Sequence, residues 1–126
     1  MTSCPFCKAE PSGLFWESDR VRVMWDSRPL TDGHTLVVPV RHVASYFDTS
    51  IEERTALGEA LDVAKAKVEE HYRPDGYNIG INDAPAAGQT VPHCHIHLIP
   101  RYEGDTADPR GGVRWILPDR ARYWQS

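Results

Sequence analysis

The stretch GQTVPHCHIHLIPRY, residues 88–102, carries three histidines at alternate positions: His93, His95 and His97. Successive side chains of a β-strand point to opposite faces, so a strand over residues 93–99 would place all three imidazoles on one face. The residues between them would then face the core: Cys94, Ile96 and Leu98. Three imidazoles are hard to satisfy in an apolar interior. The pattern therefore predicts a histidine face that a ligand or substrate reaches.

A single metal ion cannot bind all three histidines of a regular strand. A strand rises about 3.3 Å per residue, which puts the Cα atoms of His93 and His97 roughly 13 Å apart. A zinc ion lies only about 2.0–2.1 Å from an imidazole nitrogen. One ion can therefore bind one or two of these histidines, and at least one is left for another role.

Phosphate chemistry is the role that the sequence favours for the remaining histidines. A neutral imidazole is a competent nucleophile, and a second imidazole beside it can contact phosphate oxygens or transfer a proton. The preceding loop supplies a flexible glycine together with amide and hydroxyl donors that suit an approaching phosphate. These three residues are Gly88, Gln89 and Thr90.

The rest of the chain predicts an α+β domain with a largely antiparallel sheet. Strands are expected over residues 20–26, 34–40, 77–82 and 93–99. One long helix is expected over residues 51–72, with an apolar stripe of Leu57, Leu61, Ala64 and Val68. Ser50 and Glu53 form a capping-box pattern at its start.

Residues 1–126 are expected to form a single domain, because a chain of 126 residues buries one core but not two. Within it, residues 1–102 would form the core and the Pro-, Gly- and Arg-rich residues 103–126 an irregular C-terminal arm. The formal net charge of −4 argues against a nonspecific grip on nucleic acid. The sequence shows neither a membrane span nor a signal peptide, so the expected compartment is the cytoplasm.

The cysteine pair of CPFC, residues 4–7, has two interpretations. A redox motif of this kind normally follows a strand and opens a helix, and both flanking elements are missing here. As half of a zinc site, the pair needs two more ligands. Cys94 is expected to be a small buried hydrophobe, and His71 to be solvated at the polar end of the helix.

Two histidines are candidates to complete such a zinc site. His42 follows the strand expected over 34–40, and His93 begins the histidine strand. If the two strands are neighbours in the sheet, a tetrahedral site becomes feasible. Spacing alone leaves the zinc and redox interpretations open.

Three segments of the chain resemble the histidine triad (HIT) proteins: GHTLVVP at 33–39, NDAPAAGQTVPH at 82–93 and HCHIHLI at 93–99. The similarity runs from about residue 4 to residue 102. It implies a compact α+β fold with a five-stranded antiparallel sheet, one long and one short helix, and homodimers whose sheets join. It also implies nucleotide binding and cleavage at the α-phosphate, with transfer of a nucleoside monophosphate first to a histidine and then to water or another acceptor.

The resemblance assigns roles to individual residues. His95 would be the nucleophile, His97 would contact the α-phosphate beside it, and His34 would be a supporting histidine. Asp26 would bind the ribose hydroxyls, while Phe6 and Met24 would either flank the base or simply pack in the core. The residues around the phosphates would be Asn82, Gly88, Gln89 and Thr90. A zinc-containing branch of the family implies a structural zinc bound by Cys4, Cys7, His42 and His93.

The GQT segment, with Thr90, favours a hydrolase of dinucleoside polyphosphates such as diadenosine tri- or tetraphosphate. Arginines of the arm would either meet the distal phosphates or pair with nearby carboxylates; they are Arg101, Arg110 and Arg114, against Glu103, Asp105 and Asp108. Alternative substrates are nucleoside phosphoramidates and aminoacyl adenylates, which differ only in the leaving group. Two further alternatives are a non-catalytic, zinc-stabilised nucleotide-binding module and a thiol oxidoreductase that uses CPFC.

Overall fold

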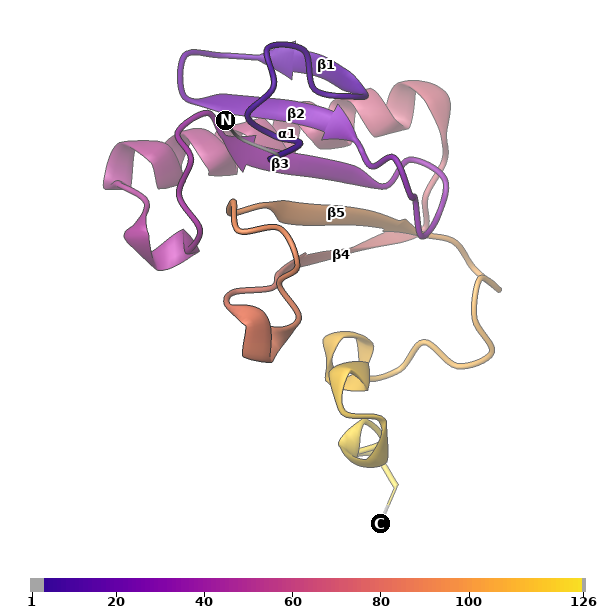
Figure 1. Ribbon diagram of the computed structural model, residues 1–126. Helices are drawn as coiled ribbons and strands as arrows, with labels where there is room; N and C mark the ends of the chain where they lie inside the picture. Colours follow the sequence, from indigo (N-terminus) through magenta and orange to yellow (C-terminus); the bar gives the residue numbers. More distant parts are fainter. Residues whose placement is uncertain (1–3, 126) are drawn as a thin grey trace.

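A five-stranded antiparallel sheet forms the centre of the computed structural model, which describes residues 4–125 (Figure 1). Its strands are β1 (Leu14–Glu17), β2 (Val21–Trp25), β3 (Thr35–Pro39), β4 (Gly76–Ile81) and β5 (Ile96–Arg101). Their order in the sheet is β1-β2-β3-β5-β4, and every neighbouring pair is antiparallel. The sequence prediction of an antiparallel α+β domain is confirmed.

One long helix, α1 (Ile51–His71), covers one face of the sheet, as Figure 1 shows. The predicted capping box forms: the Ser50 hydroxyl accepts the Glu53 N–H at 3.0 Å, and a Glu53 carboxylate oxygen accepts the Ser50 N–H at 2.8 Å. These bonds satisfy amide groups that the first turn of a helix leaves without partners. The helix therefore begins where the sequence predicts.

The two faces of the sheet bury different kinds of side chain. Apolar residues of β2, β3 and β5 pack against α1 on the helix side: Val21, Val23, Val37, Ile96 and Leu98 against Leu57, Ala60, Ala64 and Val68. Leu61 of the predicted stripe is only partly buried, and Ala60 takes its place in the core. The opposite face carries the histidines and a smaller cluster, formed by Cys4, Phe6, Met24, Leu36 and Val38. The larger cluster contributes most of the hydrophobic stabilisation of the fold, and the smaller one packs beside the histidines.

The strand predicted over residues 93–99 was wrong at its start, because β5 begins only at Ile96. Pro92 has no N–H to give to a ladder. The N–H groups of His93 and Cys94 bond to loop carbonyls instead, that of His93 to Val91 at 2.8 Å and that of Cys94 to Val43 at 2.7 Å. Only the third histidine of the row therefore lies in the regular sheet.

The histidine face is also more covered than the alternation suggests. His93 is fully buried and His95 is only 8% exposed, because the N-terminal segment lies across this face. One nitrogen of each imidazole donates to a backbone carbonyl, Nε2 of His93 to Pro39 and Nδ1 of His95 to His93. The expectation of an open histidine face therefore holds only for the half-buried His97.

Strand β1 was not among the strands predicted from the residues. It pairs with β2 through the short turn at Ser18, whose N–H bonds to the Val21 carbonyl at 2.8 Å. Gly13 precedes it with a φ of 77°, a conformation that favours glycine, and an added Cβ would meet the Trp25 carbonyl at 2.7 Å. Four residues of sequence are too few for a periodic pattern to be recognised.

Short 3₁₀ turns account for the remaining regular structure: Tyr46–Asp48, Pro85–Ala87, Gly112–Ile116 and Pro118–Arg120. The last two belong to the C-terminal arm, which extends away from the α1 side of the sheet (Figure 1). Within residues 4–125, no helix has the length and apolar character that crossing a membrane requires.

An ion pair joins the segment after β3 to the start of α1. Arg41 donates to both carboxylate oxygens of Glu53, at 3.1 and 2.8 Å, and to the Asp48 carbonyl at 3.0 Å. The Arg41 guanidinium lowers the pKa of the Glu53 carboxyl from 4.5 to about 2. Glu53 therefore contributes both to the helix cap and to the placement of residue 42.

We predict that Glu53→Gln lowers the free energy of unfolding at pH 7 by about 1–3 kcal/mol, because a buried charge-assisted bond is lost. A depressed carboxyl pKa stabilises the folded state above the unfolded value of 4.5, and this contribution disappears as pH falls toward about 2. Urea unfolding of both proteins between pH 2 and 7 measures the difference. Glu52→Gln, an exposed neighbour, is the control, and an equal loss in both variants would contradict the assignment.

Candidate metal centre and histidine site

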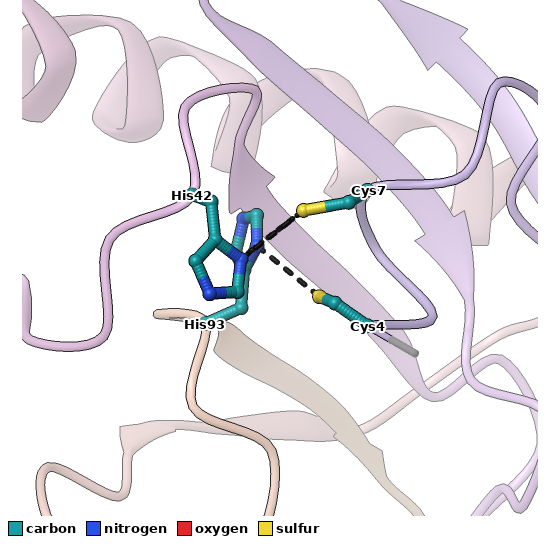
Figure 2. Close-up of side chains that lie close together, drawn as sticks. All are labelled: Cys4, Cys7, His42 and His93. Carbon is teal, nitrogen blue, oxygen red and sulfur yellow. Dashed lines mark hydrogen bonds between the residues drawn. The ribbon is translucent and has the colours of Figure 1, made fainter. Parts of the chain in front are cut away.

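Four metal-binding side chains converge at one edge of the histidine face: Cys4, Cys7, His42 and His93. Their ligand atoms all lie within 4.8 Å of one another. Figure 2 shows the two cysteines approaching from the N-terminal loop and the two imidazoles from the segments beside β3 and β5. The sequence made a tetrahedral site feasible only if the strands next to His42 and His93 are neighbours, and β3 and β5 are neighbours in the sheet.

The distances in this group fit a tetrahedral zinc site. The Cys4 and Cys7 sulfurs lie 3.4 and 3.5 Å from His93 Nδ1, and the Cys7 sulfur lies 3.1 Å from His42 Nδ1. The two Nδ1 atoms are 3.1 Å apart. A tetrahedron with zinc bonds of about 2.0–2.3 Å has edges of roughly 3.3–3.8 Å. Only a small expansion of the cluster is needed to place an ion at its centre.

The hydrogen bonding of His93 points its lone pair at the cluster. Its Nε2–H donates to the Pro39 carbonyl at 2.7 Å, so in the neutral imidazole Nδ1 carries the lone pair. Burial lowers the pKa of His93, which favours this neutral form. A carbonyl behind the ring is the usual support of a metal-binding histidine. Four protein ligands would leave no open position for water, so the donor set suits a structural ion.

Arg22 fixes the N-terminal segment against β2. Its Nη1 donates to the carbonyls of Phe6 and Lys8 at 3.0 and 2.6 Å, and its Nε donates to Glu17. These two carbonyls flank Cys7 in the sequence. The segment that carries both cysteines is therefore attached to the sheet by protein contacts as well as by any metal.

The same segment places an aromatic ring between two of the histidines. The Phe6 ring meets His93 edge-on at 5.6 Å between centroids and lies tilted on His95 at 5.2 Å. Phe6 is 7% exposed and Met24 is 2% exposed. Both side chains are core residues of the smaller cluster in this structure, and Phe6 directly connects the metal centre with the middle histidine.

A backbone carbonyl fixes the tautomer of the middle histidine. His95 Nδ1 lies 2.8 Å from the carbonyl oxygen of His93. A carbonyl can only accept, so Nδ1 carries the proton and Nε2 carries the lone pair. An imidazole held in this tautomer presents an unprotonated nitrogen without needing another base.

The third histidine ends a chain of hydrogen bonds. The Leu30 N–H donates to His34 Nδ1 at 3.0 Å, which leaves the proton of His34 on Nε2. This Nε2–H faces His97 Nδ1 at 2.9 Å and an Asp26 carboxylate oxygen at 3.4 Å. His97 therefore accepts at Nδ1 and keeps its proton on Nε2. The ring centroids of His97 and His95 are 5.1 Å apart, so the Nε2–H donor of His97 lies on a ring next to His95.

Asp26, His34 and His97 also have the composition of a metal-binding group. The hydrogen bond from Leu30 contradicts that use, because a protonated Nε2 of His34 has no lone pair for a metal. Burial lowers the pKa of His34, against the opposing charge of Asp26. Burial, followed by His95 and His34, lowers the pKa of His97 to about 4. Both imidazoles are therefore neutral at pH 7, and the group is a hydrogen-bonded relay.

The loop before the histidines is shaped by its own side chains. Gln89 accepts the Ala84 N–H at 2.8 Å and donates to the carbonyls of Ala44 and Val91 at 2.9 and 3.0 Å. Ala84 has φ 80° and ψ 158°, a region that is nearly restricted to glycine. Gly88 ends the 3₁₀ turn with φ 96°. Gln89 thus maintains the shape of the loop in this structure.

The other expected nucleotide-binding residues lie near this loop. Asn82 is half-buried at the end of β4, and Thr90 is exposed. Between Asn82 and the loop, Asp83 accepts the Ser45 hydroxyl at 3.0 Å and the Tyr46 N–H at 2.8 Å, which joins two loops. Sequence reasoning missed this role of Asp83, although its carboxylate follows directly on a strand end.

Two of the three arginines pair with carboxylates, as their alternative interpretation predicts, and the third binds backbone carbonyls instead. Arg101 binds both oxygens of Asp105 at 2.8 Å. Arg110 binds Asp108 at 3.0 and 3.1 Å, and Arg114 donates to backbone carbonyls of the arm. These guanidinium groups are engaged within the protein. Arg22 and Pro39, which support the metal centre, were not predicted, because only the folded chain shows which carbonyl or guanidinium lies behind a ligand.

A family model described as the HIT domain matches residues 8–104 of this chain. The chain belongs to the HIT family. A HIT protein of Mycobacterium smegmatis, whose crystal structure is described as Zn-bound, superposes with a TM-score of 0.73 at 38% identity, covering 84% of this chain and 80% of that one. The HIT fold predicted from the sequence is confirmed.

Two curated HIT relatives are named for an activity. The bifunctional bis(5'-adenosyl)-triphosphatase/adenylylsulfatase FHIT of Arabidopsis thaliana is 36% identical, over 78% of this chain and 54% of that protein. The bis(5'-adenosyl)-triphosphatase of Saccharomyces cerevisiae is 34% identical, over 88% of this chain and 52% of that protein. The chain thus spans about half the length of these relatives.

Proposed function

We propose that this HIT protein is a hydrolase of dinucleoside polyphosphates that cleaves at the α-phosphate through a nucleotidyl-histidine intermediate. The observation that carries the proposal is the bond between His95 Nδ1 and the His93 carbonyl, which leaves Nε2 of His95 as an unprotonated nucleophile. The names of the Arabidopsis and yeast relatives support a diadenosine triphosphate-like substrate.

In the first step, His95 Nε2 attacks the α-phosphorus and forms a P–N bond while the P–O bond to the distal phosphate breaks. The electron pair of that bond leaves with the distal phosphates. The His97 Nε2–H donates to an α-phosphate oxygen, and the proton remains on His97 because the His34 Nε2–H occupies its Nδ1. In the second step, water attacks phosphorus and the P–N bond breaks; the electron pair of that bond returns to His95 Nε2, which takes up the proton that the water loses and then releases it to solvent.

The remaining residues bind the nucleotide in this proposal. Asp26, already close to His34, binds the ribose hydroxyls. Asn82 and Thr90, with the backbone at Gly88, contact the phosphates, and Gln89 orders the loop that carries them. The apolar side chains Phe6 and Met24 flank the base after a local opening, because both are buried in the present structure. The same groups would accept a phosphoramidate or an aminoacyl adenylate, since only the leaving group differs.

We predict that His95→Ala lowers kcat/KM for diadenosine triphosphate by at least about 10³-fold, because the nucleophile is removed. Release of adenosine monophosphate is followed by chromatography. The control is His71→Ala, an exposed histidine at the end of α1. A panel that includes an adenosine phosphoramidate and an aminoacyl adenylate ranks the leaving groups. Unchanged turnover by His95→Ala would contradict the mechanism, and a wild type that prefers the phosphoramidate would contradict the substrate.

We propose further that zinc is bound by the four side chains of the metal centre and that its role is structural. The zinc would attach the N-terminal segment to the sheet and fix the ring of His93 beside the nucleophile. Thiol ligands persist where disulfides are rare, which agrees with the cytoplasm as the proposed compartment. The thiol oxidoreductase alternative is not favoured, because both sulfurs face the imidazoles of His42 and His93.

We predict that purified protein contains zinc and that its removal lowers the melting temperature by at least about 10 °C, corresponding to a few kcal/mol for a domain of this size. Differential scanning calorimetry before and after chelation measures the change. Cys7→Ser should lose zinc, whereas Cys94→Ala should retain it, because Cys94 is a buried residue outside the metal centre. An apoprotein that melts like the zinc-bound protein would refute the structural role.

We also propose that two copies associate through β4. Among residues 4–125 this strand has β5 as its sole neighbour, and an outer strand presents backbone groups that a second chain can bind. Ile79 of β4 is 54% exposed beside an apolar groove against α1, lined partly by Leu57, Leu61 and Ile81. A second copy would bury this surface.

We predict that Ile79→Arg shifts the protein from dimer to monomer in sedimentation equilibrium, because the substitution places a charge in the apolar contact. Ile116→Arg, which alters an exposed isoleucine of the arm, should leave the dimer intact. A wild-type protein that sediments as a monomer at all concentrations would rule out this association.

A further inference from the structure

A pocket of about 500 Å³ lies between the C-terminal arm and the sheet. Its floor includes Asn78, Ile99 and Arg101, and its walls include Leu30 and the arm residues Trp115 and Arg122. Ligand sites in proteins typically measure about 300–1,000 Å³. The pocket therefore has the size of a ligand site, and its lining includes neither the three histidines of the row nor the residues of the metal centre.

The pocket continues the histidine row along the same face of the sheet. Side chains two residues apart on a strand share a face, so Ile99 and Arg101 lie on the face of His97. Asn78 is paired with Ile99 across the strands and adds to the same surface. At the other wall, the Leu30 N–H is the donor that fixes His34. At about 3.3 Å per residue, Ile99 lies at most about 13 Å along the chain from His95, a span within reach of a bridging polyphosphate.

The charges of the pocket are balanced. Arg101 pairs with Asp105 and also donates to the Asn78 side-chain oxygen at 2.7 Å. Arg110 pairs in the same way with Asp108, which lines the pocket. The guanidinium of Arg101 lowers the pKa of Asp105 to about 2, so that carboxylate stays ionised and paired. A lining of this kind gives little attraction for a phosphate, and it suits a neutral group with hydrogen-bonding edges.

One wall is planar and aromatic. The Trp115 indole N–H donates to the Arg110 carbonyl at 2.7 Å, which fixes the ring. The Arg122 guanidinium lies over the indole, 5.1 Å from its centroid. Nucleobases stack on indole rings and on guanidinium planes because each presents a flat polarisable face.

We propose that this pocket binds the second nucleoside of a dinucleoside polyphosphate, the one that leaves with the distal phosphates. The inference rests on the proposed function. The base stacks against the wall of Trp115 and Arg122, and Asn78 and the arm provide hydrogen bonds to the nucleoside. The phosphates extend between the pocket and His95. In this proposal the arm, residues 103–125, selects dinucleoside substrates over mononucleotides. Packing against the sheet alone would not give it that role.

The test compares ligand binding by the full chain with and without the aromatic wall. Calorimetric titrations use a nonhydrolysable methylene-bridged analogue of diadenosine triphosphate and, separately, adenosine monophosphate. Trp115→Ala should weaken binding of the analogue about 10- to 100-fold, the range that loss of one base stack produces. Binding of adenosine monophosphate should stay within about twofold, because it fills only the site beside His95.

Two variants separate stacking from folding of the arm. Trp115→Phe keeps an aromatic face while losing the bond to the Arg110 carbonyl, and it should retain most of the affinity for the analogue. Tyr123→Ala removes an aromatic residue of the same arm that is 69% exposed and outside the pocket lining, so it should have no effect.

The outcomes distinguish the pocket from the hydrolase proposal. Equal weakening of both ligands by Trp115→Ala, or weakening of neither, overturns the assignment of the pocket while leaving hydrolysis at His95 intact. Turnover of diadenosine triphosphate by the wild type, measured in parallel, tests the hydrolase proposal separately. Wild-type protein that binds the analogue no better than adenosine monophosphate also overturns the second subsite.

Discussion

The hydrogen bond from His95 Nδ1 to the carbonyl of His93 is the contact on which the histidine row depends. This bond orients the imidazole of His95 because its acceptor, the backbone carbonyl of His93, is itself held in place. The ring of His93 is bound to Pro39 on one side and to the cysteine cluster on the other. The residue that a metal would hold is therefore the same residue that selects the tautomer of its neighbour.

Apolar packing against α1 occupies one face of the sheet, and the histidines occupy the other. The helix side buries mainly apolar groups, which gain from close packing, and the hydroxyl of its buried Thr35 donates to the Gly33 carbonyl at 2.8 Å. The other side contains five histidines within a small area, and hydrogen bonds identify the tautomers of four of them: His34, His93, His95 and His97. Such a network is stable only when complete, since an unpaired polar atom in a low-dielectric site is costly. In the relay from Leu30 through His34 to His97, each N–H donor between these residues has an acceptor.

Much of the fold was predictable because its signals are local. The alternation around His95, the stripe of α1 and the capping box at Ser50 each depend on neighbours in sequence. The start of β5 was not predictable, because Pro92 redirects two amides to carbonyls of distant loops. The burial of His95 was equally hidden. It results from Phe6, whose position depends on contacts made after the chain has folded.

The site was predictable in its composition more than in its arrangement. The ligand set of the metal centre followed from the family resemblance, and the structure brings these side chains together. Which atom of each imidazole faces which neighbour could not be read from residue types, because that depends on carbonyls such as that of Pro39. The pairing of Arg101 with Asp105 similarly required the turn that follows β5.

The backbone of Ala84 has a consequence for how the loop meets its ligand. A residue other than glycine at φ 80° and ψ 158° carries strain of about 1–3 kcal/mol that the surrounding contacts must outweigh. Gln89 supplies such a contact by accepting the Ala84 N–H. Glycine would relieve the strain, yet it would also give the free loop many more conformations. Alanine instead confines the unliganded loop to a narrow set of shapes, so little conformational entropy would remain to be lost on binding the phosphates of the proposed substrate.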